Sequence, residues 1–287
     1  MTTAYLDKYW KSRGANALRA AFGQIIRTNR KQGQQLLAAP ENSFPVIYIL
    51  APVIESAKLV EALPDRVKFA MYITLRRSGQ NFRAKLYSDA LGGSVGEPPY
   101  EALKWMILTG AKWDGPSSGH DAFDAAIDLA AAYFAEKYDD PEVYSTLAET
   151  IFRRNRQGLA IHDLVWGFFH TVSLGALAYI ARNLLSSNPA DVDLTCELMG
   201  FEKPATQKER QALFDEYMAW LSEHRKYLYA TGEYFNQTSR PFHVRHDREA
   251  KHISKEINPR DRTALTALTS EERQTLEVFR ANTQKEM

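Results

Sequence analysis

Cysteine is nearly absent from this sequence, which has a single thiol, Cys196, among its 287 residues. One thiol can form neither an intrachain disulfide framework nor a four-thiolate metal site. Cys196 stands between Leu194 and Leu198, and a free cysteine in an apolar stretch behaves as a small core residue. We therefore expect a core position for Cys196 and a reducing, cytoplasmic location for the protein.

Apolar runs long enough to cross a membrane are also lacking. Residues 164–181 contain no Lys, Arg, Asp or Glu, but they fall at the short end of the roughly 20 residues that a spanning helix needs. Gly167 and Gly175 interrupt the run, so we expect two consecutive buried helices and no membrane span. The opening residues, MTTAYLDKYW, contain charges and no apolar signal core, so we expect no secretory peptide.

Recognisable catalytic and cofactor-binding motifs are missing as well. The glycine-rich stretch GGSVG, residues 92–96, follows no predicted strand and opens no helix with a lysine, as a phosphate-binding loop would. No Ser-His-Asp arrangement stands out from the order of the residues. We expect the protein to bind no cofactor.

Two clusters contain residue types that can bind metals. His120, Asp124 and Asp128 follow one another at intervals of four and share one helix face. His243 and His246 lie in a histidine-rich segment near the C-terminus. The first cluster also fits the solvent face of an amphipathic helix, and the second is crowded by Arg and Lys side chains that would repel a cation. We predict no metal site and keep these clusters as alternatives.

The net charge of +1 is unevenly distributed along the chain. Residues 1–91 hold 14 Lys/Arg and 6 Asp/Glu (+8), residues 92–201 hold 7 and 15 (−8), and residues 202–287 hold 15 and 14 (+1). We divide the chain accordingly into a basic helical region, an acidic region of helical hairpins that continues the same domain, and a C-terminal helix with a tail. The opposite charges could also draw two copies together head to tail.

The hydrophobic pattern is that of a helical protein. Residues 15–37 place apolar side chains on one side and arginines on the other, which predicts one amphipathic helix. The run FPVIYILAPVI, residues 44–54, fits a strand or a helix, and we favour a helix because no second strand pattern lies nearby. Pro64 opens a further helix, and residues 100–108 form a short one.

The middle of the chain contains a repeated pattern. Pro141 and Pro189 each follow an Asp or Asn, and each such turn stands between two predicted helices. Over residues 120–201 the chain resembles the HEAT-like family of helical repeats, in which antiparallel helix pairs stack into a solenoid. The resemblance implies an all-α fold of stacked antiparallel helical hairpins; any two helices joined by such a turn would look similar.

The C-terminal region differs in character. Residues 206–230 predict an amphipathic helix, and residues 236–263 lack helical periodicity and predict a charged, extended tail. Thr269 and Glu272 have the spacing of a capping box, which predicts a last short helix.

Arg156 and His162 are candidate catalytic residues. They are separated by five residues, and this arrangement resembles that of the HEPN class of helical ribonucleases. The resemblance implies that His162 would act as acid and base while Arg156 stabilises charge on phosphorus. In the alternative, the basic cluster ends a helix, its charges complement the helix dipole, and Gly158 is the cap.

Two functions remain open from the sequence. Helical surfaces, the uneven charge and the missing catalytic motif favour a non-enzymatic scaffold or adaptor that binds protein partners. The alternative is nucleic-acid binding, because clustered basic side chains neutralise phosphates. The candidate contacts for that alternative are Arg19, Arg27, Arg30, Arg76, Arg77, Arg153 and Arg154.

Overall fold

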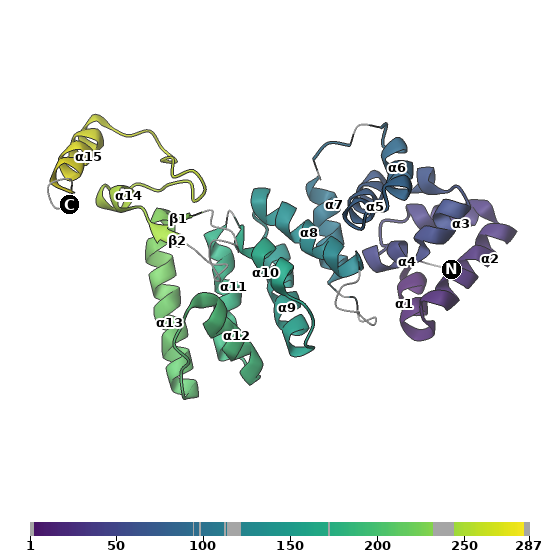
Figure 1. The fold of residues 1–287 in the computed structure, drawn as a ribbon, viewed down its shortest axis with the longest axis horizontal. Helices are drawn as coiled ribbons and strands as arrows, with labels where there is room; N and C mark the ends of the chain where they lie inside the picture. The colour runs from purple at the N-terminus through teal and green to yellow at the C-terminus, as the bar shows by residue number, and fades with distance from the viewer. Residues whose placement is uncertain are drawn as a thin grey trace. The chain divides into compact units, whose positions relative to one another are not determined.

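The protein is all-α, as predicted. A computed structural model describes residues 3–93, 95–97, 99–111, 113, 122–171, 173–231 and 244–283. Within these residues the chain forms α-helices α1 to α15, four short 3₁₀ segments and one pair of three-residue strands (Figure 1). No helix among them has both the length and the apolar character that a bilayer crossing would demand.

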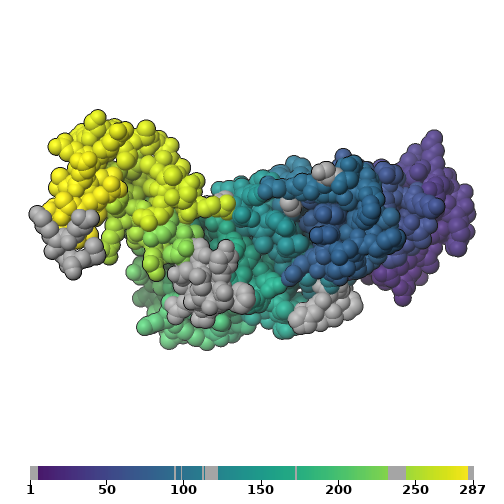
Figure 2. Space-filling view, turned by 45° about the horizontal axis from the view of Figure 1, so that its top comes forward, coloured from purple at the N-terminus to yellow at the C-terminus, as the bar shows by residue number. Residues whose placement is uncertain are grey.

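The chain folds into two compact units. Unit 1 contains residues 1–134 and 158–167, and unit 2 contains residues 135–157 and 168–287. The boundary between the units therefore falls inside the region 92–201 that the charge pattern set apart. On the face shown in Figure 2, the purple and blue residues of unit 1 form one continuous surface.

Unit 1 is built around α4, which contacts α1, α2, α5 and α7. Its helices before α8 are α1 (Thr3–Arg13), α2 (Ala15–Thr28), α3 (Arg30–Ala38), α4 (Phe44–Ser56), α5 (Asp65–Arg77), α6 (Asn81–Asp89) and α7 (Tyr100–Gly110), with a 3₁₀ turn, η1 (Val60–Ala62).

The ambiguous run 44–54 is helical, as we favoured. Ser43 caps the N-terminus of α4 by accepting a hydrogen bond from the backbone N–H of Val46. The strand-like composition of α4 reflects its central position, because a helix surrounded by other helices is apolar on nearly every side. Ile47, Ile49 and Leu50 lie on different sides of the helix axis, and all three are buried.

Residues 15–37 do not form the single helix that we predicted. The helix ends at Thr28, and a new one starts at Arg30. Asn29 lies between them in a non-helical conformation, and its side chain accepts a hydrogen bond from the backbone N–H of Gln32 at 3.0 Å. Asparagine is a strong N-cap, so it restarts the helix in a new direction while the apolar periodicity continues through the break.

Gly167 does not interrupt the apolar run, contrary to our expectation. It lies inside α10 (His162–Phe169), where α10 packs against α8 (Ala122–Lys137). A Cβ atom at Gly167 would lie 3.1 Å from the backbone nitrogen of Ala132, so the glycine permits close helix packing. The run remains split into separate helical segments, because the helix stops after Phe169 and a 3₁₀ turn begins at Leu174.

Unit 2 packs its helices around α9 and α11. Its elements are α9 (Pro141–Arg156), η2 (Leu174–Ala176), α11 (Leu177–Ala181), η3 (Arg182–Leu185), α12 (Pro189–Met199), α13 (Gln207–His224), η4 (Arg225–Tyr227), β1 (Leu228–Ala230), β2 (Val244–His246), α14 (Arg248–His252) and α15 (Ser270–Thr283). α9 contacts α11 and α12, and α13 contacts α11 and η3.

Both Asx-Pro turns begin helices in the same way. The Asp140 side chain accepts from the backbone N–H of Glu142 at 2.9 Å, and the Asn188 side chain accepts from that of Ala190 at 3.0 Å. Each cap is followed by proline at the first helical position. The segment before the second turn is broken into 3₁₀ and α pieces, whereas α8 before the first turn is continuous. The solenoid-like stacking stays a prediction.

The C-terminal region contains more regular structure than we predicted. Helix α13 ends at His224 instead of residue 230, because β1 follows and pairs antiparallel with β2. The part of the expected tail after residue 243 contains β2 and α14. It is fixed by the carboxylate of Asp247, which is 5% exposed, caps α14 and binds Arg262 at 2.9 Å. The predicted capping box at α15 is confirmed, with Thr269 and Glu272 bonded reciprocally.

Candidate functional site

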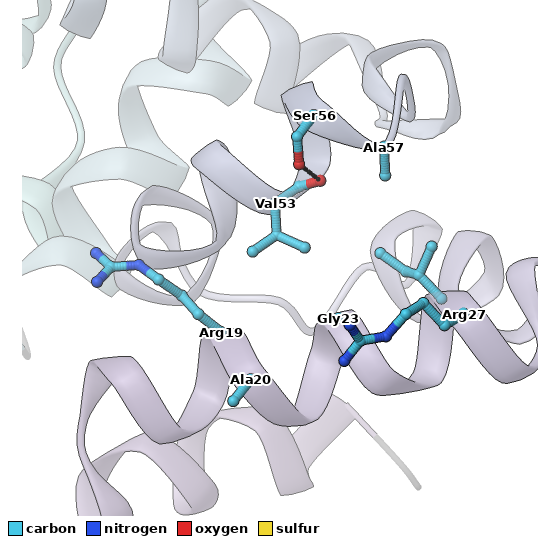
Figure 3. Close-up of a pocket in the computed structure, with 8 residues that line it drawn as sticks. Arg19, Ala20, Gly23, Arg27, Val53, Ser56 and Ala57 are labelled. Carbon is cyan, nitrogen blue, oxygen red and sulfur yellow. Dashed lines mark hydrogen bonds between the residues drawn. The ribbon is translucent and has the colours of Figure 1, made fainter.

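An open groove lies between α2 and α4 of unit 1 (Figure 3). It has a volume of about 450 Å³. The lining residues on the two helices and just after α4 are Arg19, Ala20, Gly23, Ile26, Arg27, Val53, Ser56 and Ala57. The groove combines small and aliphatic side chains with two arginines, and none of the described residues that line it carries a carboxylate.

The two walls of the groove are parallel helices in a fixed register. The Arg19 Nε–H donates to the carbonyl of Ile49 at 2.9 Å, and the nearest atom to a Cβ placed at Gly23 would be Val53 Cγ1, at 4.0 Å. In both contacts the residue of α4 is 30 positions after the residue of α2, so the two helices run in the same direction. The register places the last turn of α2 beside the end of α4.

Small residues keep the groove open. Glycine inside a helix costs about 1 kcal/mol relative to alanine, yet Gly23 lies in the middle of α2 with ordinary space around it. A side chain could be accommodated there, so packing does not require the glycine. Ala20 beside it and Ala57 opposite add little volume, and the floor of the groove remains accessible.

The arginines of the groove lack carboxylate partners among the described residues. Arg19 donates to the Ile49 carbonyl and, through Nη1, to Asn16 Oδ1 at 2.9 Å. Arg27 is exposed and makes no hydrogen bond or ion pair with any described residue. Its side chain extends back toward Gly23 (Figure 3). Arg30 donates to the carbonyl of Lys58 at 3.2 Å, just beyond α4. The groove is therefore a concentration of uncompensated positive charge.

Glu55 does not neutralise this charge, although it belongs to α4. Its side chain is 12% exposed and binds Arg83 through two hydrogen bonds, of 2.7 and 2.9 Å. The Tyr87 hydroxyl donates to the same carboxylate at 3.1 Å, and burial together with the Glu55 charge raises the pKa of Tyr87 well above its usual value. The carboxylate of Glu55 therefore ties α4 to α6.

A smaller pocket of about 200 Å³ lies on the other side of Arg19, which lines both hollows. Pro52 lines the smaller pocket and interrupts the hydrogen bonding of α4, because proline has no N–H to donate. The Arg19 side chain meets the α4 backbone three residues before Pro52, at Ile49.

The seven arginines proposed from the sequence are divided between the two units. Arg76 and Arg77 are exposed at the end of α5, where Arg77 pairs with Asp163 at 3.5 Å. Arg153 and Arg154 belong to unit 2, and Arg154 is only 3% exposed. Arg19 and Arg27 line the groove, and Arg30 donates to the Lys58 carbonyl, one residue after the lining residue Ala57.

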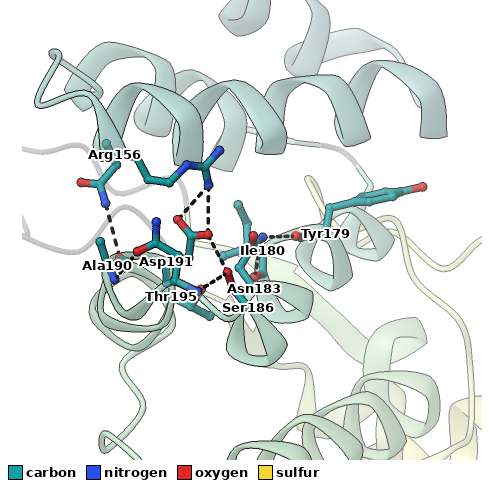
Figure 4. Close-up of polar contacts among 10 residues, drawn as sticks. Arg156, Tyr179, Ile180, Asn183, Ser186, Ala190, Asp191 and Thr195 are labelled. Atoms are coloured by element: carbon teal, nitrogen blue, oxygen red, sulfur yellow. Dashed lines mark hydrogen bonds and ion pairs between the residues drawn. The ribbon is translucent and has the colours of Figure 1, made fainter.

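Arg156 has a structural partner (Figure 4). One guanidinium nitrogen, Nη1, lies 2.9 Å from both carboxylate oxygens of Asp191, which is 3% exposed and also accepts from Ser186 at 2.7 Å. His162 is exposed, and its Nδ1 lies 2.9 Å from Asp163. Arg156 belongs to unit 2 and His162 to unit 1. The helix end that the alternative expected is present, since α9 stops at Arg156 and Gly158 has φ +67°.

The metal-binding alternatives gain no support from the described residues, where no three His, Cys, Asp or Glu side chains gather as ligands would. His120 and His243 lie outside those residues. Cys196 is 6% exposed, as a core thiol would be, and burial raises its pKa.

His246 of unit 2 has a partly buried ring that packs against a second histidine. The rings of His224 and His246 are 4.8 Å apart beside Trp220, and His246 Nε2 is buried with no hydrogen-bond partner in the described chain. Burial lowers the pKa of His246, and His224 and Lys251 lower it further. The unfolded chain therefore takes up a proton first as the pH falls through about 6.5.

We expect the thermal midpoint of unit 2 to fall between about pH 7.5 and pH 5.5, the range in which histidine titrates. Scanning calorimetry would measure it. A His246→Gln variant should have a flatter pH profile, whereas replacement of the exposed His162 in unit 1 should not flatten it. An unchanged profile in His246→Gln would show that another group is responsible.

Sequence reasoning found the arginines of the groove but missed its floor. Arg19, Gly23 and Arg27 are spaced by four residues, so a helical projection of α2 alone would have placed a glycine between two arginines. No comparable signal pointed to Val53, because it comes beside Gly23 only in the tertiary structure.

The fold and the groove define an all-α protein with a cationic surface groove. The chain matches no protein-family model, no curated protein and no solved structure.

Proposed function

We propose that this protein is a non-enzymatic adaptor that binds protein partners through the surfaces of its helices. The observation that carries this proposal is the open α2–α4 groove, with an apolar floor between uncompensated arginines. Open grooves of this kind suit the binding of a segment from another protein.

The contrast with other arginines of the chain supports a binding role. Arg83, Arg156, Arg262 and Arg280 each pair with a carboxylate and thereby connect elements of the fold. Arg27 makes no such connection within the described residues. Its charge is therefore available to a partner, and its removal would break no contact with the described residues.

Affinity capture with a matched pair of charge-reversal variants tests the proposal. The full-length chain, Arg27→Glu and Arg13→Glu would each be used to capture proteins from an extract of the native host. Arg13 is also exposed and without a partner in the described chain, but it does not line the groove. We expect Arg27→Glu to lose specific partners that Arg13→Glu retains. Identical captured sets would refute the role of the groove.

Nucleic-acid binding is a second candidate, favoured by the positions of Arg19 and Arg27 in one groove and of Arg30 near its end. Phosphate contacts make affinity fall steeply with salt, because each contact releases counterions. Retention on heparin and on labelled RNA over a salt series tests it, and no retention at low salt would remove it.

The ribonuclease version of this candidate has a separate test, which is RNA cleavage by a His162→Ala variant. Cleavage that is unchanged in this variant would remove it. The ion pair with Asp191 gives Arg156 a structural role in unit 2.

A further inference from the structure

We propose that the α2–α4 groove binds an acidic, amphipathic helical segment of a partner protein. This inference rests on the adaptor function and specifies the partner's chemistry. Two carboxylates of the segment would meet Arg19 and Arg27, and aliphatic side chains between them would cover Gly23, Ile26 and Val53.

The spacing of the arginines fits a helix. Arg19 and Arg27 are eight residues apart on α2, which corresponds to about 12 Å along the helix axis. A second helix lying along the groove offers carboxylates at the same interval when they are seven or eight residues apart. Each guanidinium can then form charge-assisted hydrogen bonds with one carboxylate.

The floor between the arginines is apolar. Ile26 and Val53 are half-buried, so part of each side chain remains uncovered. Gly23 and Ala57 leave room above the floor for aliphatic side chains from the partner. Burying apolar surface there adds binding free energy to the two ion pairs.

The composition of the groove favours a peptide over a nucleic acid. None of its eight lining residues is aromatic, whereas proteins that bind single strands usually stack bases on aromatic side chains. A carboxylate-bearing helix uses both the charge and the aliphatic floor, while a phosphate backbone would use the charge alone.

Fluorescence anisotropy with a synthetic peptide tests this inference on the full-length protein. The probe is a labelled amphipathic peptide of about 15 residues, long enough for helix formation, with two Glu seven positions apart and Ala and Leu between them on one face. The comparison peptide has Gln in place of both Glu. We expect the Glu peptide to bind at least about tenfold more tightly, because charged pairs form stronger hydrogen bonds than neutral ones.

Two variants act on the groove in different ways. Arg27→Glu removes a cation that has no partner in the described residues, and Gly23→Leu fills the floor with a side chain. We expect each to weaken binding of the Glu peptide by about tenfold or more, with Arg13→Glu changing it less than about twofold. Circular dichroism checks that Gly23→Leu is folded. If Gly23→Leu does not fold, the binding measured with Arg27→Glu alone decides the test.

Several outcomes would overturn the inference. These are no binding of the Glu peptide up to about 1 mM, equal binding of the Gln peptide, and unchanged binding by Arg27→Glu. Tighter binding of a single-stranded RNA that is lost in Arg27→Glu would identify a nucleic acid as the occupant instead. If Arg27→Glu still loses captured protein partners while the Glu peptide does not bind, the adaptor function stands and only the acidic segment is wrong.

Discussion

Replacing Phe44 by alanine should lower the free energy of unfolding of unit 1 by about 4 kcal/mol, within the range measured for buried Phe→Ala substitutions. The Phe44 side chain is fully buried at the start of α4. Its ring stacks on Phe123 at a centroid distance of 5.0 Å and meets the edge of Trp105 at 5.7 Å. Alanine leaves a cavity at the junction of three helices, because its single methyl group cannot fill the space of the ring.

Urea unfolding followed by tryptophan fluorescence measures this loss, since Trp105 lies against the ring. Phe82→Ala is the matched control, because Phe82 belongs to the same unit and is 82% exposed. We expect it to change stability by less than about 0.5 kcal/mol. Equal effects of the two substitutions would contradict the packing described here.

Replacing Asp191 by alanine should destabilise unit 2 by about 3 kcal/mol, as expected when one partner of a buried ion pair is removed. The Asp191 side chain is 5% exposed and holds Arg156 and the Ser186 hydroxyl. It also lies in the first turn of α12, where a carboxylate is favoured by the helix dipole. Arg156 is 39% exposed, so water can partly solvate the guanidinium that loses its partner.

Asp193 offers a control on the same helix. It pairs with Lys203 at the surface, where its side chain is 51% exposed, and we expect Asp193→Ala to cost less than about 0.5 kcal/mol. A double-mutant cycle between Asp191 and Arg156 isolates the energy of the pair itself. A coupling energy near zero would show that Asp191 acts only through its other contacts.

The positions of several helix ends could be predicted from short sequence patterns. Asp140 and Asn188 each precede a proline, and both cap helices in the structure. The Thr269–Glu272 capping box also formed as expected. These features depend on residues a few positions apart, so no knowledge of distant contacts was required.

Other elements depended on contacts that the local pattern does not contain. The apolar periodicity of residues 15–37 continues through Asn29, although the chain changes direction there. The charged stretch after residue 243 has the local pattern of a tail, because contacts such as that between Asp247 and Arg262 join residues 15 positions apart. The sequence pattern at Gly167 suggests a helix break, but the glycine is needed for close packing against the backbone of Ala132 on another helix. That contact is not visible in the local sequence.

For the candidate groove, too, one part could be predicted from the sequence and another could not. Its charge was visible in the sequence, since Arg19, Arg27 and Arg30 are close together on neighbouring helices. The absence of a carboxylate partner for Arg27 among the described residues could not be predicted, because the sequence does not show that Glu55, the acidic residue of α4, binds Arg83.

By itself, the sequence determined the all-α class, the helix caps and the basic character of α2, since helix formation and charge are set by residues within a few turns of one another. The tertiary structure alone decided that α2 and α4 lie parallel with Gly23 opposite Val53, that Arg156 is bound to Asp191, and that the end of the chain folds onto itself. These are contacts between residues 15 to 35 positions apart, and long-range packing fixes them where local preference cannot.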